Sequence, residues 1–257
     1  MTGSKGVAVD LSGQIALVTG GSRGIGRACS IILARAGAAV AVHYGHRHAD
    51  ADEVVAAIRS GGGRATAVAA DMAKEGEVEE AIRRATKELG APTILVNNAG
   101  IWEGRAVEEM TPADWDRTFA VNTRSMFLCA RAVVPAMKAA RAGRIVNVAS
   151  TAGQRGEAFH SDYAASKGAV IAFTRSLATE LASFGIRVNC VAPGWVDTEM
   201  CAEVFASGGR EKIASTIPMG RVGRPEEIAE AVLFAASDLA GFMTGSVISV
   251  NGGAVMA

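Results

Sequence analysis

The chain has no surplus of charge of either sign: its 257 residues include 26 Lys and Arg against 26 Asp and Glu. This balance argues against a nucleic-acid partner, because proteins that neutralise a phosphate backbone carry a basic surplus. No apolar run approaches the ~18 residues of a membrane span, and the first dozen residues lack the apolar stretch of a signal peptide. We therefore expect a cytoplasmic protein without a nucleic-acid or membrane partner.

Cysteines are few and widely spaced. The four of them, Cys29, Cys129, Cys190 and Cys201, form no C-x-x-C pair. We therefore expect neither a disulfide framework nor a zinc site, and a reducing compartment fits this usage. Because His and Asp also lack the spacing of metal ligands, we expect no catalytic metal.

What the chain does contain is a glycine-rich turn between an apolar strand and an apolar helix. Residues 15–18 predict a buried parallel strand, and residues 25–36 predict a helix packed on a sheet. In such a turn, free backbone N–H groups and the helix dipole attract an anion such as a pyrophosphate. The spacing differs from G-x-G-x-x-G, so a plain turn is the alternative. The expected nucleotide-binding residues of this turn are Gly20, Ser22, Arg23, Gly24, Ile25 and Gly26.

Strand and helix patterns alternate along the rest of the chain. Further strands are expected at 39–44, 66–70, 93–96, 144–149, 186–191 and 246–250. Helices are expected at 50–60, 75–89, 112–141 (with a break near Asn122), 161–184 and 225–237. This rhythm predicts an α/β fold, a doubly wound parallel sheet with helices on both faces, as a single domain over 1–257. Residues 1–13 should form a loose lead-in, and residues 193–220 should be irregular.

The end of the second strand lacks the acidic residue that is typical of NAD sites. Folds that prefer NAD place Asp or Glu there to hold the ribose 2′-hydroxyl, whereas a nearby Arg accepts the 2′-phosphate of NADP. Here the strand ends at Tyr44, no carboxylate precedes Asp50, and Arg23 and Arg47 are near. We interpret this pattern as a preference for NADP(H), with NAD(H) as the alternative. Solvated surface charges are the other interpretation of the two arginines.

The next two strand ends also carry residues suited to a nucleotide. Asp71, followed by Met72, is placed to accept the amine of an adenine, or to cap the next helix. The run Asn97–Gly100 offers amides that tie neighbouring loops together and small residues that leave room for a cofactor. We therefore expect Asn98, Ala99 and Gly100 to contact the cofactor, with a simple turn as the alternative.

A tyrosine and a lysine, four residues apart, follow the fifth strand. Tyr163 and Lys167 lie on one helix face by this spacing, and Ser150 ends the strand before them. An ammonium group below the phenol would lower the Tyr163 pKa from about 10, making it a usable acid or base. Such a pair often marks only a solvated helix face, but this chain has just two tyrosines.

Taken together, these motifs resemble the short-chain dehydrogenase/reductase family over about residues 11–253. The pieces that match are Thr19-Gly20-x-x-x-Gly24-Ile25-Gly26, Asp71, Asn97–Gly100, Asn122, Ser150, Tyr163-x-x-x-Lys167 and Pro193-Gly194. The resemblance implies a Rossmann-type fold and transfer of a hydride between a nicotinamide and a carbonyl or alcohol carbon.

The resemblance also implies a role for each matching residue. Tyr163 would be the general acid or base, and Lys167 would hold the nicotinamide ribose and lower the pKa of Tyr163. Ser150 would polarise the substrate oxygen, and Asn122 would hold a water of a proton relay. Further cofactor contacts would come from Pro193, Gly194, Val196 and Thr198.

Within the family, residues 219–228 and 244–253 are similar to the 3-oxoacyl-acyl-carrier-protein reductase type. This implies an NADPH-dependent reduction of a 3-oxoacyl thioester or related ketone to a secondary alcohol. An NAD-dependent alcohol or sugar dehydrogenase is the alternative, and a nucleotide-binding redox sensor is a non-enzymatic rival. Acyl carrier protein is a weaker prediction as a partner. Reductases of this type often contact the carrier through two basic residues; Arg141 matches one of them, but Phe184 stands at the position of the other.

Three segments should shape the pocket for a small-molecule substrate. They contribute Trp102, Phe159, His160, Trp195 and Met200, and residues 195–217 suit a mobile lid. The helices expected at 112–141 and 161–184 carry apolar residues on more than one face, and only one face can cover the sheet. A second subunit should cover the other, and the family resemblance adds a homotetramer.

Overall fold

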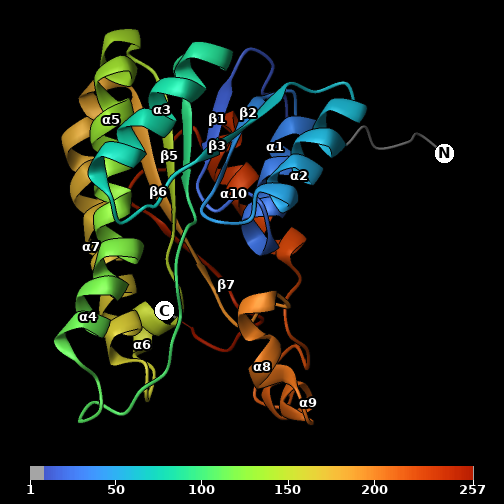
Figure 1. Cartoon of the computed structure of the whole chain (residues 1–257), viewed down its shortest axis with the longest axis vertical. Helices are drawn as coiled ribbons and strands as arrows, with labels where there is room; N and C mark the ends of the chain where they lie inside the picture. Colours follow the sequence, from blue (N-terminus) through green and yellow to red (C-terminus); the bar gives the residue numbers. More distant parts are fainter. Residues whose placement is uncertain (1–8, 257) are drawn as a thin grey trace.

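Seven parallel strands form one sheet in the computed structural model, which describes residues 9–256 (Figure 1). The strands are β1 (Ile15–Val18), β2 (Ala39–Tyr44), β3 (Ala65–Ala69), β4 (Ile94–Asn97), β5 (Gly143–Val148), β6 (Ile186–Pro193) and β7 (Val247–Val250). They are ordered β3-β2-β1-β4-β5-β6-β7, and every neighbouring pair is parallel. The predicted doubly wound sheet is confirmed. The strand order reverses between β1 and β4, and ligands of such sheets bind beside this switch point.

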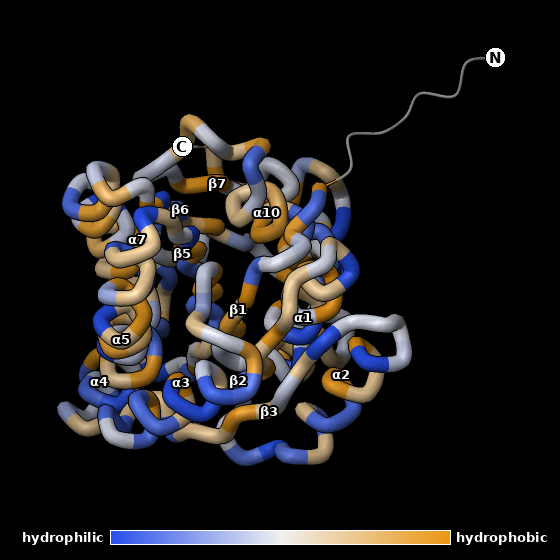
Figure 2. The backbone as a smooth tube through the Cα atoms, turned by 90° about the horizontal axis from the view of Figure 1, so that it is seen from above, coloured by the Kyte–Doolittle hydropathy of each residue, from blue (hydrophilic) through white to orange (hydrophobic). Residues whose placement is uncertain are grey.

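Helices cover both faces of the sheet (Figures 1 and 2). One layer holds α1 (Gly24–Arg35), α2 (His48–Ser60) and α10 (Pro225–Ala236), and the other holds α3 (Glu75–Leu89), α5 (Ser125–Ala140) and α7 (Ser161–Leu181). Alternate residues of β1 enter the two resulting cores: Val18 packs in the first and Leu17 in the second. This alternation explains why the strand is apolar throughout, since both of its faces are buried.

The long helix predicted at 112–141 is interrupted, as expected, at Asn122. It consists of α4 (Pro112–Phe119), a π-helical turn over Ala120–Arg124, and α5. Thr111 is the N-cap of α4, and its side chain and backbone exchange hydrogen bonds with Asp114 in a capping box. The π-helical turn widens the helix by one residue at the position of Asn122, and such turns are frequent at functional sites.

Two expectations about irregular segments are wrong in part. Residues 1–8 of the predicted lead-in lie outside the described residues, but Leu11 is buried and its N–H donates to the carbonyl of Ala36 over 2.6 Å. The segment after β6 is not wholly irregular, because it forms a 3₁₀ turn (Glu199–Cys201), α8 (Ala202–Phe205) and α9 (Gly209–Ala214). A short helix, α6 (Ala152–Arg155), was not expected, and 3₁₀ turns also occur at Ala182–Phe184 and Asp238–Ala240.

No helix within residues 9–256 combines the length and the apolar character that crossing a membrane requires. The single domain over 1–257 stays a prediction, since its two ends fall outside the described part of the chain.

Candidate active site

The glycine turn between β1 and α1 is built so that backbone can approach backbone closely. Gly20 and Gly24 adopt φ angles of +61° and +51°, a region that L-residues avoid. A Cβ atom added to Gly26 would lie 1.9 Å from the carbonyl oxygen of Gly20. Only glycine therefore lets α1 begin this close to the turn, with its N-terminal N–H groups available to an anion.

A buried histidine holds this turn in place. The N–H of Gly20 donates to Nδ1 of His43 over 2.9 Å, so the ring proton sits on Nε2, which donates to the carbonyl of Ala70 over 3.0 Å. Burial lowers the pKa of His43, which keeps the ring neutral and suits both bonds. His43 thus links the ends of β1, β2 and β3, a role that the sequence analysis missed.

The two asparagines at the end of β4, Asn97 and Asn98, tie different parts of the sheet. Nδ2 of Asn98 donates to the carbonyl of Thr19 over 3.0 Å, and the Thr19 hydroxyl accepts the N–H groups of Asn98 and Ala99 over 2.9 and 3.0 Å. Asn97 donates instead to the Asn147 side chain on β5 over 2.9 Å. The predicted tie between neighbouring loops is therefore confirmed for Asn98.

A cavity of about 450 Å³ opens beyond the carboxyl ends of the strands, within the usual size range of ligand pockets. Every predicted cofactor residue except Gly26 lines it, and Gly26 lies behind the turn. Ser150, Tyr163 and Lys167 line the same cavity. The structure thus brings the glycine turn and the tyrosine–lysine pair, far apart in sequence, to one space.

Tyr163 and Lys167 share one face of α7 but do not pair directly. The Lys167 ammonium donates to the carbonyl of Val148 over 2.8 Å and lies 5.8 Å from the centre of the Tyr163 ring. Burial raises the pKa of Tyr163 to about 12, against the opposing effect of the Ser150 hydroxyl, and lowers the pKa of Lys167 to about 8. Desolvation dominates the shift at Tyr163, and the lowering of its pKa by Lys167 stays a prediction.

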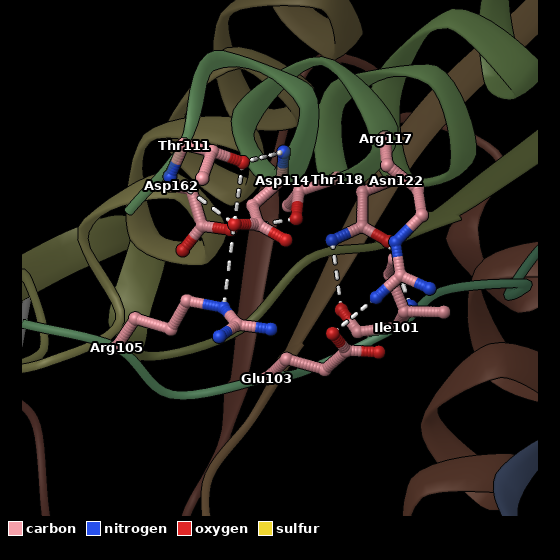
Figure 3. A network of polar contacts seen from close by, with 9 residues as sticks. All are labelled: Ile101, Glu103, Arg105, Thr111, Asp114, Arg117, Thr118, Asn122 and Asp162. Atoms are coloured by element: carbon pink, nitrogen blue, oxygen red, sulfur yellow. Dashed lines mark hydrogen bonds and ion pairs between the residues drawn. The ribbon is translucent and has the colours of Figure 1, made fainter. Parts of the chain in front are cut away.

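Asn122 faces inward from the π-helical turn and is fully buried. Its Oδ1 accepts the N–H of Ile101 over 2.8 Å, and its Nδ2 donates to the Ile101 carbonyl over 3.0 Å (Figure 3). Nδ2 also reaches the Ser166 hydroxyl over 3.1 Å. Asn122 is separated from Lys167 by Gly100, where an added Cβ would lie 3.2 Å from Asn122 Oδ1 and 3.5 Å from Lys167 Nζ. Its relay role with Lys167 stays a prediction.

The loop after β4 is fastened to α4 by polar contacts (Figure 3). Glu103 forms an ion pair with Arg117, and Arg105 Nε lies 3.4 Å from Asp114 Oδ2. The Thr118 hydroxyl donates to Asp162, one residue before Tyr163, over 2.6 Å. Helix α4 therefore fixes both the loop that carries Trp102 and the first turn of α7.

Three of the five predicted substrate residues line the cavity, namely Trp102, Trp195 and Met200. His160 does not line the cavity but stacks on Trp102, with ring centres 4.4 Å apart. Phe159 does not reach the cavity: its backbone has a left-handed φ of +63°, and its side chain is 69% exposed. The left-handed turn thus directs the ring toward solvent, which the sequence pattern did not indicate.

The cavity also contains residues that the sequence analysis did not single out, among them Arg155, Glu199 and Cys201. Asp71 lines it too, and its Oδ1 accepts the N–H of Ala73 over 3.0 Å. It does not cap α3, whose N-cap is Lys74, so that alternative is wrong. Across residues 9–256, no group of three or more His, Cys, Asp or Glu is placed to hold a metal ion.

A sequence profile described as Enoyl-(Acyl carrier protein) reductase matches residues 20–255 of this chain. The chain belongs to the short-chain dehydrogenase/reductase family. It is accordingly an oxidoreductase with a Rossmann fold, from a family that binds NAD(P) cofactors. The resemblance drawn from the sequence motifs is confirmed.

Relatives within the short-chain dehydrogenase/reductase family differ in the reactions that their names state. A 3-oxoacyl-[acyl-carrier-protein] reductase of Synechocystis sp. is 42% identical over 247 residues, covering 96% of this chain and 98% of the relative. A cis-4-hydroxycyclohexanecarboxylate dehydrogenase of Sinomonas cyclohexanicum is 42% identical over 241 residues, covering 93% and 96%. The solved structure of a proposed gluconate dehydrogenase from Agrobacterium tumefaciens has a TM-score of 0.92 and 33% identity, covering 96% and 98%. Equal identity to the first two leaves the substrate to be argued from the site.

Proposed function

We propose that this protein reduces a carbonyl compound to a secondary alcohol with NADPH, and that Tyr163 is the general acid. The observation that carries the proposal is the shared cavity, which joins the glycine turn to Ser150, Tyr163 and Lys167. A nucleotide on the turn would extend toward the tyrosine, where a substrate oxygen can meet its hydroxyl.

The residues present fit a dinucleotide that carries a 2′-phosphate. The close approach at Gly20 and Gly26 leaves the N-terminus of α1 open to a pyrophosphate. Arg23 and Arg47 both line the cavity, and β2 ends in Tyr44 rather than in a carboxylate that would hold a 2′-hydroxyl. Lys167 would hold the nicotinamide ribose. When bound, the reduced nicotinamide supplies the hydride that adds to the carbonyl carbon.

The chain itself supplies the proton. With a pKa near 12, the buried Tyr163 keeps its proton at neutral pH, as a general acid in the reducing direction must. Ser150 lies beside it and would donate a hydrogen bond to the same substrate oxygen. As negative charge develops there, the phenol gives up its proton, and the Lys167 ammonium stabilises the phenolate left behind.

The substrate class that we propose is a 3-oxoacyl thioester or a related ketone. Trp102, Trp195 and Met200 offer an apolar and adaptable lining for it. Near Arg141, the position expected to offer a second basic contact to a carrier protein holds Phe184 instead. Lys138 lies 4.5 Å above the Phe184 ring and pairs with Glu180, so its charge is already partnered. The relatives named as dehydrogenases of a cyclic hydroxy acid and of gluconate favour the alternative, an NAD-dependent alcohol or sugar dehydrogenase.

The proposal is tested by comparing NADPH and NADH turnover on 3-oxoacyl thioesters and simple ketones. We expect NADPH to be preferred, and Tyr163→Phe to lower kcat by roughly 10²–10⁴-fold. The variant should still bind NADPH, as followed by nicotinamide fluorescence, which separates lost chemistry from lost folding. Full activity of Tyr163→Phe would show that the acid is assigned wrongly, and faster oxidation of alcohols with NAD would favour the alternative.

A further inference from the structure

Glu199 occupies the two arginines that we assign to the cofactor phosphate. Its Oε2 atom lies 3.0 Å from Nη1 of Arg23 and 3.4 Å from Nη1 of Arg47. One carboxylate oxygen therefore bridges the glycine turn and the end of β2. Arg47 also lies 3.7 Å from Asp50, a longer ion pair.

The bridge joins three segments that lie far apart in the sequence. Arg23 precedes α1 and Arg47 precedes α2, whereas Glu199 begins the 3₁₀ turn that leads into α8. All three residues line the same cavity. In Figure 1, α8 and α9 extend from the body of the protein, and Glu199, in the turn that leads into α8, places the bridge at the base of the predicted lid.

The charges of the bridge indicate which ligand would compete with it. A carboxylate placed between two guanidinium groups offers the same kind of ligand as a phosphate, with less charge and fewer oxygens. The side chains of Arg23, Arg47 and Glu199 are 53–57% exposed, so each ion pair is weak and exchangeable. A phosphate dianion with several oxygens would compete well for both arginines.

We propose that Glu199 is a specificity-determining residue, whose carboxylate competes with the ribose 2′-phosphate of the cofactor for Arg23 and Arg47. A cofactor with that phosphate must displace Glu199, whereas one without it leaves the bridge in place. Glu199 therefore weakens binding of 2′-phosphorylated ligands selectively, and couples the presence of the phosphate to release of the segment that leads into α8. The inference rests on the proposed NADPH preference.

The test measures binding of two adenine nucleotides rather than turnover. Adenosine 2′,5′-bisphosphate carries the 2′-phosphate, and ADP lacks it. We expect Glu199→Gln to tighten binding of the bisphosphate by about 2–10-fold, on the scale of two exposed ion pairs, and to change ADP binding by less than twofold. Isothermal titration calorimetry gives both affinities at one ionic strength.

Glu203→Gln is the matched control, because it removes the same charge from α8. Glu203 is exposed and makes no ion pair with any residue in the described part of the chain. The gain from Glu199→Gln should also shrink in an Arg23→Gln background, as a double-mutant cycle requires.

The outcomes separate this inference from the proposed function. If the wild-type protein prefers the bisphosphate but Glu199→Gln does not tighten it, or Glu203→Gln tightens it equally, the competition does not exist. Weaker bisphosphate binding by Glu199→Gln would also overturn the inference. If the wild-type protein binds both nucleotides equally while Glu199→Gln prefers the bisphosphate, the competition stands and the proposed NADPH preference fails.

Discussion

Nδ1 of His43 accepts a hydrogen bond from the backbone N–H of Gly20 over 2.9 Å, so a side chain of β2 sets the position of the glycine turn after β1. The same ring donates to Ala70 at the end of β3, next to Asp71. Three strand ends that face the proposed cofactor therefore depend on one neutral imidazole.

Replacing this ring should loosen the nucleotide site. In His43→Leu, the N–H of Gly20 and the carbonyl of Ala70 lose their partners in a buried place, which costs roughly 1–3 kcal/mol each. We expect a lower free energy of unfolding in urea and weaker ADP binding. His48→Leu is the control, since His48 is exposed, pairs with Asp52 in α2, lies edge-on to Tyr44 and does not touch the glycine turn. Equal losses in the two variants would show that His43 does not hold the turn.

The same histidine predicts a pH dependence of stability. Its pKa in the folded protein is lowered below the ordinary 6.5 by burial, so the unfolded chain binds the proton at higher pH than the folded one. The contribution of His43 is therefore fully present above about pH 6.5 and is lost as the pH falls below that value. Urea unfolding at pH 5.5 and 7.5 should show a smaller difference for His43→Leu than for the wild-type protein.

Lys167 should lower the free energy of unfolding of the protein. Burial lowers its pKa from 10.5 to about 8, so below pH 8 a charged amine is kept away from water. Lys167→Met should raise the free energy of unfolding at pH 7 by on the order of 1–3 kcal/mol, while turnover is lost. The gain should decline between about pH 8 and 10.5, where the wild-type protein no longer carries the buried charge. A gain that is the same at pH 7 and 9.5 would contradict this origin.

The apolar outer face of α4 and α5 predicts contact with a second subunit, and the family resemblance implies a homotetramer. Phe127 on α5 and Trp115 on α4 are 45% and 40% exposed, although both are large and apolar. We expect light scattering to give the mass of four chains, and Phe127→Glu to reduce it. Val204→Glu, on α8 at the other side of the sheet, should leave the mass unchanged (Figure 1). A wild-type monomer would disprove the prediction.

Local patterns in the sequence predicted the elements well. The bounds of β1, β2 and α3 agree with the expected ranges, because apolar runs, glycine stops and helical periodicity act over a few residues. The i, i+4 spacing likewise placed Tyr163 and Lys167 on one face of α7. The parallel sheet followed from the alternation of elements alone.

Properties that depend on distant contacts were not predictable in this way. Glu199 meets Arg23 across 176 positions of sequence, and no motif links them. The direction of the Tyr163 pKa shift depends on how deeply the fold buries the phenol, which its neighbours in sequence do not reveal. Phe159 was misplaced because a single left-handed residue reverses the direction of a side chain.

The π-helical turn at Ala120–Arg124 fixes the number of residues between α4 and α5. Removing one residue, such as Thr123, would restore the regular hydrogen-bond ladder, but would rotate the Asn122 amide by about 100° relative to α5. Ile101 would then lose both of its bonds to that amide, and weaker nucleotide binding by the shortened chain would report it. An unbroken helix and an anchored loop after β4 are thus alternatives for this sequence, and insertions or deletions here should be tolerated far less than substitutions.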